Sequence, residues 1–361
     1  MRVSLFRGGI MKKVLYVVEA FGGGVFTFMV DLINSISKDY EVVLACSIRP
    51  QTPKNYKEYL NDNVKIIELQ NGERSINLKK DLKFFFEINS IIKKENPDIL
   101  HLHSSKAGFL GRLATNDRER KIFYNPHGYS FLKQDEKFSK KTLYKVIELL
   151  ASKKSGYIIG CSKGEYEEAL KLSKKAYLIN NGINIEKLPH YKDKPINKKN
   201  LKICTVGRIC FQKNPEVFNE IANHFKENEF IWIGDGELKD KITSPNIKIT
   251  GWVTKNDALK NLSECDIFLL PSLWEGLPIA LLEAMYYKKI CIVSNSIGNR
   301  DVINTGVNGF IANSVEDYIK VINDIANSKI DIDKIKDNEY RDILDHYNFN
   351  ITSKQYKQLY N

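Results

Sequence analysis

Short runs of β-branched and aromatic residues alternate with longer stretches of helical periodicity along the whole chain. In the first half, KVLYVV is followed by the helical stretch GVFTFMVDLINSIS and then by the apolar runs EVVLACS, DILHLHS, KIFYNPH and YIIGCS. The rhythm restarts in the second half with LKICTVGR, FIWIGDG, IKITGWV, DIFLLPS, KICIVSN and GFIAN. Strand, helix and strand in this order predict βαβ units and a parallel sheet in each half.

The stretch between the two halves, NNGINIEKLPHYKDKPINKKN, is polar and contains proline, which is typical of a linker. We therefore predict an α/β protein with two Rossmann-like parallel-sheet domains, residues 1–185 and 201–340, that are joined by a linker at 186–200 and face a central cleft. Residues 341–361 are expected to form a C-terminal helix that packs back on the N-terminal domain. Ligands of open α/β sheets bind outside the carboxyl ends of the strands, so the cleft is the expected site.

Composition agrees with a globular protein of this size, because 43% of the 361 residues are hydrophobic and 27% are charged. No apolar run approaches the roughly 18 residues of a membrane-spanning helix. The six cysteines are scattered without a C-x-x-C pair, which predicts buried, reduced thiols in a cytoplasmic protein. The start of translation is expected at Met11, since Arg-Gly-Gly just upstream can be encoded by a purine-rich ribosome-binding sequence.

The positive charge of the chain is concentrated in its first half. Residues 1–200 hold 36 Lys and Arg against 22 Asp and Glu, whereas residues 201–361 hold 19 against 22. Two interpretations remain open: a lysine-rich surface that reflects an AT-rich genome, or a half that approaches an anionic partner. No nucleic-acid-binding module accompanies the basic residues, so nucleic acid is not expected as a partner.

The first strand leads into the glycine-rich turn EAFGGGVFTF. Gly22, Gly23 and Gly24 let the backbone turn sharply and approach a ligand before a helix that is expected to begin near Val25. Thr27 stands where a dinucleotide-binding motif requires its third glycine, which disfavours a nicotinamide cofactor. A plain tight turn is the alternative.

Two cations follow the first strand of the second half in GRICFQKN. Arg208 could grip a phosphate with its planar fork, and Lys213 could do so as a point charge. In a lysine-rich protein, however, two surface cations are an equally plain explanation.

The stretch PSLWEGLPIALLEAM carries two acids beside an apolar helix. Pro278 is expected in the first turn of a helix that runs to about Tyr287, with the N–H groups of Gly276 and Leu277 directed at a diphosphate. Glu275 and Glu283 would then lie on either side of that diphosphate, where carboxylates are good acceptors for hydroxyl groups. This order suits a nucleotide sugar. The alternative is that Glu275 caps the helix and Glu283 is solvated.

Three further patterns leave two interpretations each. His101 and His103 share one strand face and could join His127 at a metal, but no carboxylate or cysteine cluster accompanies them, so no metal site is predicted. The sequence GDGE is interpreted as a turn beneath a nucleotide base rather than a metal motif.

In KQDEKFSKKTLYKVIELLASKK, an apolar set on an approximately helical face is surrounded by lysines; this set comprises Phe138, Leu143, Ile147 and Leu150. That helix either faces the core or meets anionic lipid head groups.

Taken together, these segments resemble glycosyltransferase family 4, which has the GT-B fold, a retaining mechanism and the signature E-x7-E, here EGLPIALLE. The resemblance runs nearly end to end through GGGVFTFMVDL, PDILHLHSSKAGFLGRLA, NPHGYSF, IIGCSKGEYEEAL, INNGIN, VGRICFQKNP, IGDGEL, SECDIFLLPSLWEGLPIALLEAM and NSIGNRDVINTGVNGFI. It is strongest with members that build bacterial capsule, exopolysaccharide or protein-linked glycans.

The resemblance implies a role for each matched position. Glu275 would bind hydroxyls of the transferred sugar, Glu283 the ribose, and Arg208 and Lys213 the diphosphate. Backbone N–H groups of Gly276 and Leu277 would also reach the diphosphate. His127 would face the sugar near the reacting carbon, while Gly23 and Gly24 would bind the donor by lining the acceptor side of its diphosphate.

The resemblance also implies a retaining hexosyl- or N-acetylhexosaminyl-transferase that needs no metal cofactor. Its donor would be a nucleotide sugar, UDP-linked by expectation, and its acceptor a lipid-linked or other glycan. The protein would be cytoplasmic, with a peripheral contact at the anionic inner face of the cell membrane. Two alternatives are a nucleotide-sugar epimerase of the same fold and a non-catalytic subunit that binds glycan or membrane.

Overall fold

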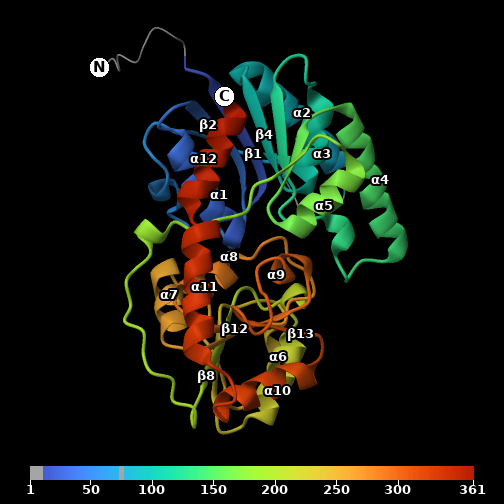
Figure 1. Ribbon diagram of the computed structural model, residues 1–361. Helices are drawn as coiled ribbons and strands as arrows, with labels where there is room; N and C mark the ends of the chain where they lie inside the picture. Colours follow the sequence, from blue (N-terminus) through green and yellow to red (C-terminus); the bar gives the residue numbers. More distant parts are fainter. Residues whose placement is uncertain (1–10, 73–76) are drawn as a thin grey trace.

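The computed structural model describes residues 11–72 and 77–361, which form two lobes with a parallel sheet in each (Figure 1). Within these residues, the N-terminal domain has a seven-stranded sheet of order β3-β2-β1-β4-β5-β6-β7. Its strands are β1 (Lys13–Phe21), β2 (Glu41–Ile48), β3 (Lys65–Glu68), β4 (Ile99–His103), β5 (Lys121–Asn125), β6 (Tyr157–Gly160) and β7 (Ala176–Leu178). Its helices are α1 (Gly23–Ile36), α2 (Leu78–Glu95), α3 (Ser105–Ala114), α4 (Phe138–Lys154) and α5 (Lys163–Leu172).

The C-terminal domain has, among the described residues, a six-stranded sheet of order β10-β9-β8-β11-β12-β13. Its strands are β8 (Lys202–Val206), β9 (Glu229–Ile233), β10 (Ile247–Ile249), β11 (Ile267–Leu270), β12 (Ile290–Ser294) and β13 (Phe310–Ala312). The helices that follow the interdomain passage are α6 (Pro215–His224), α7 (Lys255–Ser263), α8 (Ile279–Tyr286), α9 (Ile297–Arg300), α10 (Val315–Ala326), α11 (Ile332–His346) and α12 (Phe349–Tyr360). The predicted fold class of two parallel-sheet α/β domains is confirmed.

The central strands are apolar on both sides because helices cover both faces of each sheet. In β1, Tyr16 and Val18 belong to one hydrophobic cluster, and Leu15 and Val17 to the cluster on the opposite face. Each is at most 1% exposed. Replacing a leucine in such a position by alanine typically costs about 2–5 kcal/mol of unfolding free energy, so β1 anchors the sheet from which the first glycine turn emerges.

The chain passes between the domains twice, and the two passages are joined. Ile183 pairs with Asn348 in an isolated parallel bridge, just before α12 begins at Phe349. From there α12 lies along α1 of the N-terminal domain (Figure 1), and the hydroxyl of Tyr360 is 3.0 Å from that of Tyr16. The predicted domain boundary at residue 340 falls inside α11, so the helix that lies on the N-terminal domain begins later than 341.

Several smaller expectations can be compared with the described residues. The first strand begins at Lys13, as expected, whereas the residues upstream of Met11 lie outside the described ranges. All six cysteines are described, and each is a buried free thiol. In the part of the chain that the structure describes, no helix is both long enough and apolar enough to cross a bilayer.

Helix α4 has an unusual distribution of polar and apolar side chains. Its buried residues are Glu148, Ala151 and Ser152, whereas Phe138 and Leu150 are 85% and 59% exposed. Buried Glu148 accepts hydrogen bonds from Arg112 and Tyr124. The interpretation that the apolar side of this helix faces the core is therefore wrong, because the protein turns most of that side toward solvent.

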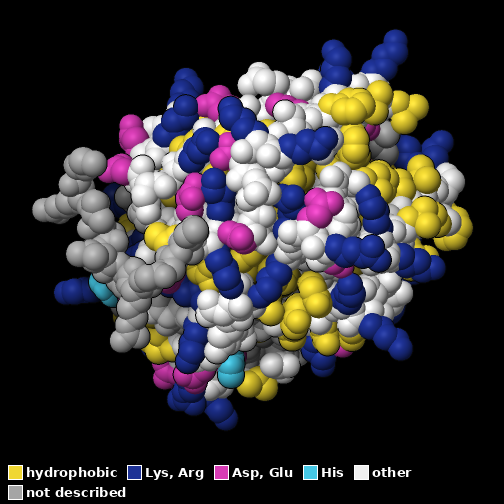
Figure 2. Space-filling view, turned by 90° about the horizontal axis from the view of Figure 1, so that it is seen from above, with side chains coloured by type: hydrophobic (Ala, Val, Ile, Leu, Met, Phe, Trp, Pro, Cys, Tyr) yellow, Lys and Arg dark blue, Asp and Glu magenta, His cyan; other side chains and the backbone are white. Residues whose placement is uncertain are grey.

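The exposed apolar side of α4 continues over its neighbours. Helix α3 contacts both α2 and α4, and together they expose Leu78, Leu82 and Phe86 of α2, Leu113 of α3, and Phe138, Leu143, Val146 and Leu150 of α4. We call these eight side chains the α2–α4 apolar face. Viewed from above, Figure 2 shows hydrophobic side chains gathered at the right of the molecule among many Lys and Arg side chains.

Candidate active site

A cleft of about 1760 Å³ opens between the two domains. It is lined by the segments that follow β1, β5, β8 and β11, as expected for the carboxyl ends of parallel strands. All nine residues predicted for the site line this cleft: Gly23, Gly24, His127, Arg208, Lys213, Glu275, Gly276, Leu277 and Glu283. The structure therefore brings these residues together, while their roles stay predictions.

The N-terminal ends of α1 and α8 approach each other across the cleft. A Cβ atom built on Gly24 would lie 3.7 Å from Cγ1 of Ile279, the first residue of α8. Helix α1 begins at Gly23, two residues earlier than predicted, and Gly23 has a φ of +55° that favours glycine. Two helix N-termini that converge in this way provide a favourable environment for an anion.

The second helix starts later than the sequence suggested. Pro278 is the N-cap of α8 rather than a residue of its first turn, so Gly276 and Leu277 lie in the preceding loop. Their N–H groups are therefore loop groups, not the free groups of the helix. Gly276 packs tightly there, since a Cβ atom on it would lie 3.0 Å from the backbone nitrogen of Gly128 in the other domain.

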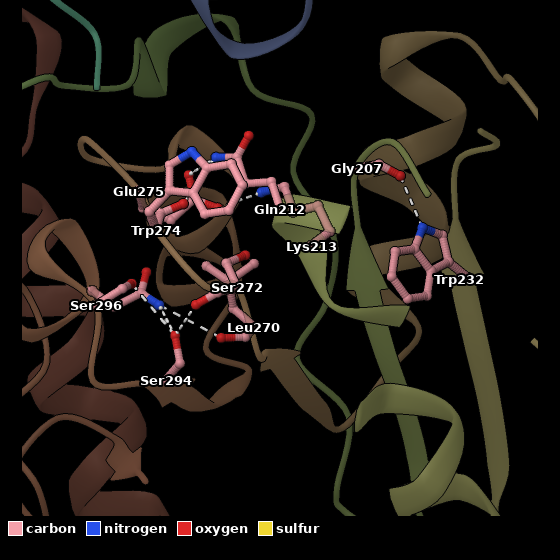
Figure 3. A network of polar contacts seen from close by, with 11 residues as sticks. Gly207, Gln212, Lys213, Trp232, Leu270, Ser272, Trp274, Glu275, Ser294 and Ser296 are labelled. Carbon is pink, nitrogen blue, oxygen red and sulfur yellow. Dashed lines mark hydrogen bonds and ion pairs between the residues drawn. The ribbon is translucent and has the colours of Figure 1, made fainter. Parts of the chain in front are cut away.

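Glu275 and Lys213 form an ion pair inside the cleft (Figure 3). Nζ of Lys213 is 2.7 Å from Oε1 of Glu275, and the two side chains are 17% and 8% exposed. Gln212 donates to the carbonyl of Trp274 at 2.9 Å, while its own carbonyl accepts from the N–H of Leu273 at 2.8 Å. These bonds fix the loop after β8 against the loop after β11, so the cation and the carboxylate keep their relative position.

Glu283 has a partner that sequence reasoning missed. Its carboxylate is 3% exposed and is paired with Nζ of Lys255, the first residue of α7. Lys255 is one of many lysines in the chain and carries no motif, so nothing in the sequence singled it out. The lysine side chain is 38% exposed, which leaves it free to move when a ligand approaches Glu283.

Arg208 lies at the rim of the cleft with a weak partner. Its Nε is 3.8 Å from Oε2 of Glu237, whose side chain is largely exposed. The preceding Gly207 has a φ of +144° and accepts a hydrogen bond at its carbonyl from the indole of Trp232 at 2.8 Å (Figure 3). The turn is thus fixed by the protein, while the guanidinium remains available for a phosphate.

His127 occupies a sharp turn at the end of β5, where its φ is +53°. Its Nε2 is 2.9 Å from Nδ1 of His103, and the ring of Phe28 packs edge-on at 5.5 Å between centroids. Burial lowers the pKa of His127 to about 4, so the imidazole is neutral near pH 7.

Glu165 supports the His127 turn, and sequence reasoning missed it. Its buried carboxylate accepts from the N–H of Gly128 at 2.6 Å and from that of Cys161 at 2.8 Å. Burial raises the pKa of Glu165, and the two backbone donors partly offset that effect. The residue lies in the quoted segment IIGCSKGEYEEAL, but a glutamate near a helix start looks like an ordinary first-turn acid.

The two domains are held together around the cleft by hydrogen bonds from side chains. Asp301 accepts from the N–H of Gly164 at 2.7 Å, and Gln134 donates to the carbonyl of Leu273 at 2.7 Å. Asn181 donates to the carbonyl of Leu277 at 3.2 Å. Within residues 11–72 and 77–361, no group of three or more His, Cys, Asp or Glu side chains is arranged to hold a metal ion.

Comparison with known proteins decides the family. The model described as Glycosyltransferase Family 4 matches residues 22–187, and that described as Glycosyl transferases group 1 matches residues 186–342. An Escherichia coli protein named UDP-Gal:alpha-D-GlcNAc-diphosphoundecaprenol alpha-1,3-galactosyltransferase is 34% identical over 76% of this chain and 78% of its own length. The chain is a family 4 glycosyltransferase.

Other relatives of this glycosyltransferase agree with that assignment. A Campylobacter jejuni protein named N,N'-diacetylbacillosaminyl-diphospho-undecaprenol alpha-1,3-N-acetylgalactosaminyltransferase is 26% identical over 94% of this chain and 96% of its own length. Sucrose-phosphate synthase from Thermosynechococcus elongatus superposes with a TM-score of 0.81 at 15% identity, covering 97% of this chain and 98% of that one. Anabaena HepE in complex with UDP-glucose gives 0.76 at 16%, covering 96% and 98%.

The glycosyltransferase therefore has the predicted GT-B fold and belongs to bacterial glycan synthesis. Its named relatives are transferases, and the comparisons favour neither an epimerase nor a non-catalytic subunit. The assignment leaves the donor, the acceptor and the individual residue roles to be argued from the cleft.

Proposed function

We propose that this glycosyltransferase moves a hexosyl or N-acetylhexosaminyl group from a UDP-linked donor to a lipid-linked glycan, with retention of the anomeric configuration. The observation that carries the proposal is the pair of nearly buried carboxylates in the cleft, Glu275 and Glu283, each beside a lysine. Two separate carboxylates suit the hydroxyls at the two ends of a nucleotide sugar, and the cations Lys213 and Arg208 in the same cleft suit its diphosphate.

In this arrangement Glu283 accepts from the ribose hydroxyls and Glu275 from the hydroxyls of the transferred sugar. Lys213 and Arg208 neutralise the diphosphate, and the N–H groups of Gly276 and Leu277 add neutral donors. His127 faces the sugar, while Gly23 and Gly24 bind the donor on the acceptor side of its diphosphate. Charge that develops on the departing phosphate is then met by groups already held in place, which is the largest common contribution to catalysis.

The proposed reaction needs no protein base. The bond from the anomeric carbon to the phosphate oxygen breaks, and the diphosphate leaves with the electron pair. The acceptor hydroxyl attacks the same face of the sugar, and its proton passes to an oxygen of the departing phosphate. Because Lys213, Arg208 and the helix N-termini supply the positive charge, we propose that the enzyme works without a divalent metal.

The part of the cleft that lies in the N-terminal domain suits a lipid-linked acceptor. The E. coli relative is named for an acceptor on diphosphoundecaprenol, and the cleft of the present chain extends to apolar side chains between α2 and α4, among them Leu82, Phe109 and Ile147. A sugar carried on a long apolar tail could reach the donor from this side, while the tail stays with the membrane.

We further propose that the α2–α4 apolar face rests on the anionic inner surface of the cell membrane. Eight of the twenty large apolar side chains that are exposed among the described residues lie on these three helices. Helix α4 also carries five lysines, and Lys137 is its N-cap; the five are Lys140, Lys141, Lys145, Lys153 and Lys154. Apolar side chains bounded by lysines suit head groups of anionic phospholipids, to which each lysine near the surface adds about 1 kcal/mol of attraction.

A donor screen tests the proposed reaction. The full-length protein is given UDP-galactose, UDP-N-acetylgalactosamine, UDP-glucose or UDP-N-acetylglucosamine with a synthetic N-acetylglucosaminyl-diphospholipid, and both UDP release and product are measured. We expect one donor to give an α-linked product. Conversion of the donor into an epimer without acceptor, or the absence of transfer from every UDP-sugar, would contradict the proposal.

Vesicle flotation tests the membrane contact separately. The protein should float with vesicles that contain phosphatidylglycerol, less with phosphatidylcholine vesicles, and less again in high salt. Replacing Leu143 and Leu150 by glutamate should abolish flotation, whereas Val307→Glu, at an exposed apolar residue of the C-terminal domain, should not. Equal loss in both variants would show that the α2–α4 apolar face has no special role.

A further inference from the structure

A column of buried polar rings crosses the N-terminal domain from the C-terminal helix to the cleft. His101 and His103 lie on one face of β4, and both are fully buried. Their ring centroids are 4.2 Å apart. At one end, His101 meets Tyr360 of α12; at the other, His103 meets His127 in the wall of the cleft. No role proposed above for the reaction uses either histidine of β4.

The hydrogen-bond partners of His101 determine which of its nitrogens carries the proton. Asn125 donates its amide N–H to the carbonyl of Ile159 at 3.0 Å, which leaves Oδ1 to face His101. An amide oxygen can only accept, so His101 must carry its hydrogen on Nε2, 2.6 Å away. Its Nδ1 is then the acceptor, and the hydroxyl of Tyr360 donates to it.

The contact between His103 and His127 has two possible directions. Nδ1 of His103 and Nε2 of His127 are 2.9 Å apart and the ring planes differ by 18°, a geometry that suits an N–H···N bond between neutral rings. Burial lowers the pKa of both imidazoles, so one hydrogen lies between them. Nε2 of His103 is buried and has no hydrogen-bond partner within the described residues.

That unpartnered nitrogen decides the direction. If His127 donated, His103 would carry its hydrogen on Nε2 as a buried N–H without an acceptor. If His103 donates from Nδ1, its Nε2 keeps only a lone pair. Unpaired buried N–H groups are rarer in proteins than under-satisfied acceptors, so the second arrangement is favoured.

We propose that His103 is a positioning residue that donates to Nε2 of His127 and thereby holds His127 in the tautomer with its hydrogen on Nδ1. The consequence for catalysis rests on the proposed function. His127 then offers the donor sugar an N–H group rather than a lone pair, and it binds a sugar oxygen instead of accepting a proton. The second ring contact described for His127, a T-shaped contact with Phe28, supplies no hydrogen bond, so it does not by itself set the tautomer.

Nitrogen NMR of the free full-length enzyme tests the tautomers without any substrate. Long-range ¹⁵N–¹H spectra of ring-labelled protein distinguish the two neutral forms, and single substitutions assign the six histidines. We expect hydrogen on Nδ1 in His103 and His127 and on Nε2 in His101. Hydrogen on Nε2 of His127 would overturn the proposal, whatever reaction the enzyme catalyses.

Substitutions of His103 test the effect on transfer. The amide of His103→Asn can place a donor where Nδ1 was, whereas His103→Leu cannot. Loss of one such hydrogen bond corresponds to roughly a fivefold to tenfold change, so we expect kcat to fall by about that factor in His103→Leu and to recover within about threefold in His103→Asn. Affinity for UDP, which lacks the sugar, should stay unchanged in both.

The control is His101→Gln, an equally buried change on the same strand face that leaves the His103–His127 bond in place. Its kcat should remain within about twofold of the unaltered enzyme. An unchanged kcat in His103→Leu, an equal loss in His103→Asn, or a parallel loss of UDP affinity would each overturn the positioning role.

Discussion

Replacing either of the two cleft carboxylates, Glu275 or Glu283, by its amide should impair transfer, but through different kinetic parameters. Glu283 is 3% exposed, and its partner Lys255 is exposed enough to turn to water, so Glu283→Gln should fold normally. Hydrogen bonds to a charged group are worth roughly 1.5–3 kcal/mol, which corresponds to about a tenfold to hundredfold loss of affinity. Ribose is bound alike before and during the reaction, so the donor KM should rise while kcat changes little.

Glu275→Gln should behave differently because its loss also releases Lys213, now held 2.7 Å from the carboxylate. The freed lysine can turn to the diphosphate, so UDP affinity should stay the same or rise. The sugar, however, gains positive charge as its bond breaks, and the missing carboxylate no longer stabilises that charge. We therefore expect kcat to fall more than KM rises.

Calorimetric titration with UDP, together with steady-state kinetics, separates the two cases. Glu237→Gln is the matched control, since its exposed carboxylate lies 3.8 Å from Arg208 at the rim of the cleft, and its UDP affinity should stay within about twofold. Equal weakening of UDP binding by Glu275→Gln and Glu283→Gln would refute the assignment of the two acids, even with the family assignment intact.

Three further predictions follow from the site and its support. Transfer measured in EDTA should equal transfer in magnesium; complete loss that magnesium or manganese restores would contradict the metal-free electrostatics. Glu165→Gln leaves the N–H of Gly128 or that of Cys161 without a good acceptor and should lower the free energy of unfolding in urea by about 1–3 kcal/mol. The control Glu167→Gln, at an exposed residue of the same helix, should change it by less than about 0.5 kcal/mol. Burial lowers the pKa of His101 to about 3, so between pH 6.5 and pH 3 this histidine is protonated in the unfolded chain but neutral in the folded protein. The free energy of unfolding should therefore fall by about 2 kcal/mol less from pH 7 to pH 5 in His101→Gln than in the unaltered enzyme. The same pH dependence in both proteins would contradict a neutral buried ring.

Most of the fold could be predicted because both sheets are parallel and covered on both faces, which makes their strands continuous apolar runs. All six strands of the second sheet that the structure describes coincide with such runs. The first sheet has two further strands, β3 and β7, which are short edge strands with half their residues or more outside the core. Their sequences, KIIE and AYL, are too short to be separated from loops by an apolar pattern alone.

The site could be predicted as a set of residues but not as a set of contacts. Glycines, cations and acids at strand ends have positions that the fold dictates, and all nine line the cleft. Lys255, which is paired with Glu283, comes from a different strand–helix unit, and no local sequence pattern predicts that these two side chains meet. The error on α4 has the opposite cause: its apolar period is genuine, but the buried bonds of Glu148 to Arg112 and Tyr124 decide which side turns inward.

The return of α12 has a consequence for how the protein is made. The N-terminal domain leaves the ribosome first, yet Tyr356 and Tyr360, both fully buried, fill one side of it and bond to Asn125, His101 and Tyr16. Until α12 has been synthesised, that side is open and its histidines face water. The N-terminal domain, which is synthesised first, is therefore completed last. A nascent chain that stops after the C-terminal domain would lack the packing of α12 behind His101, His103 and His127.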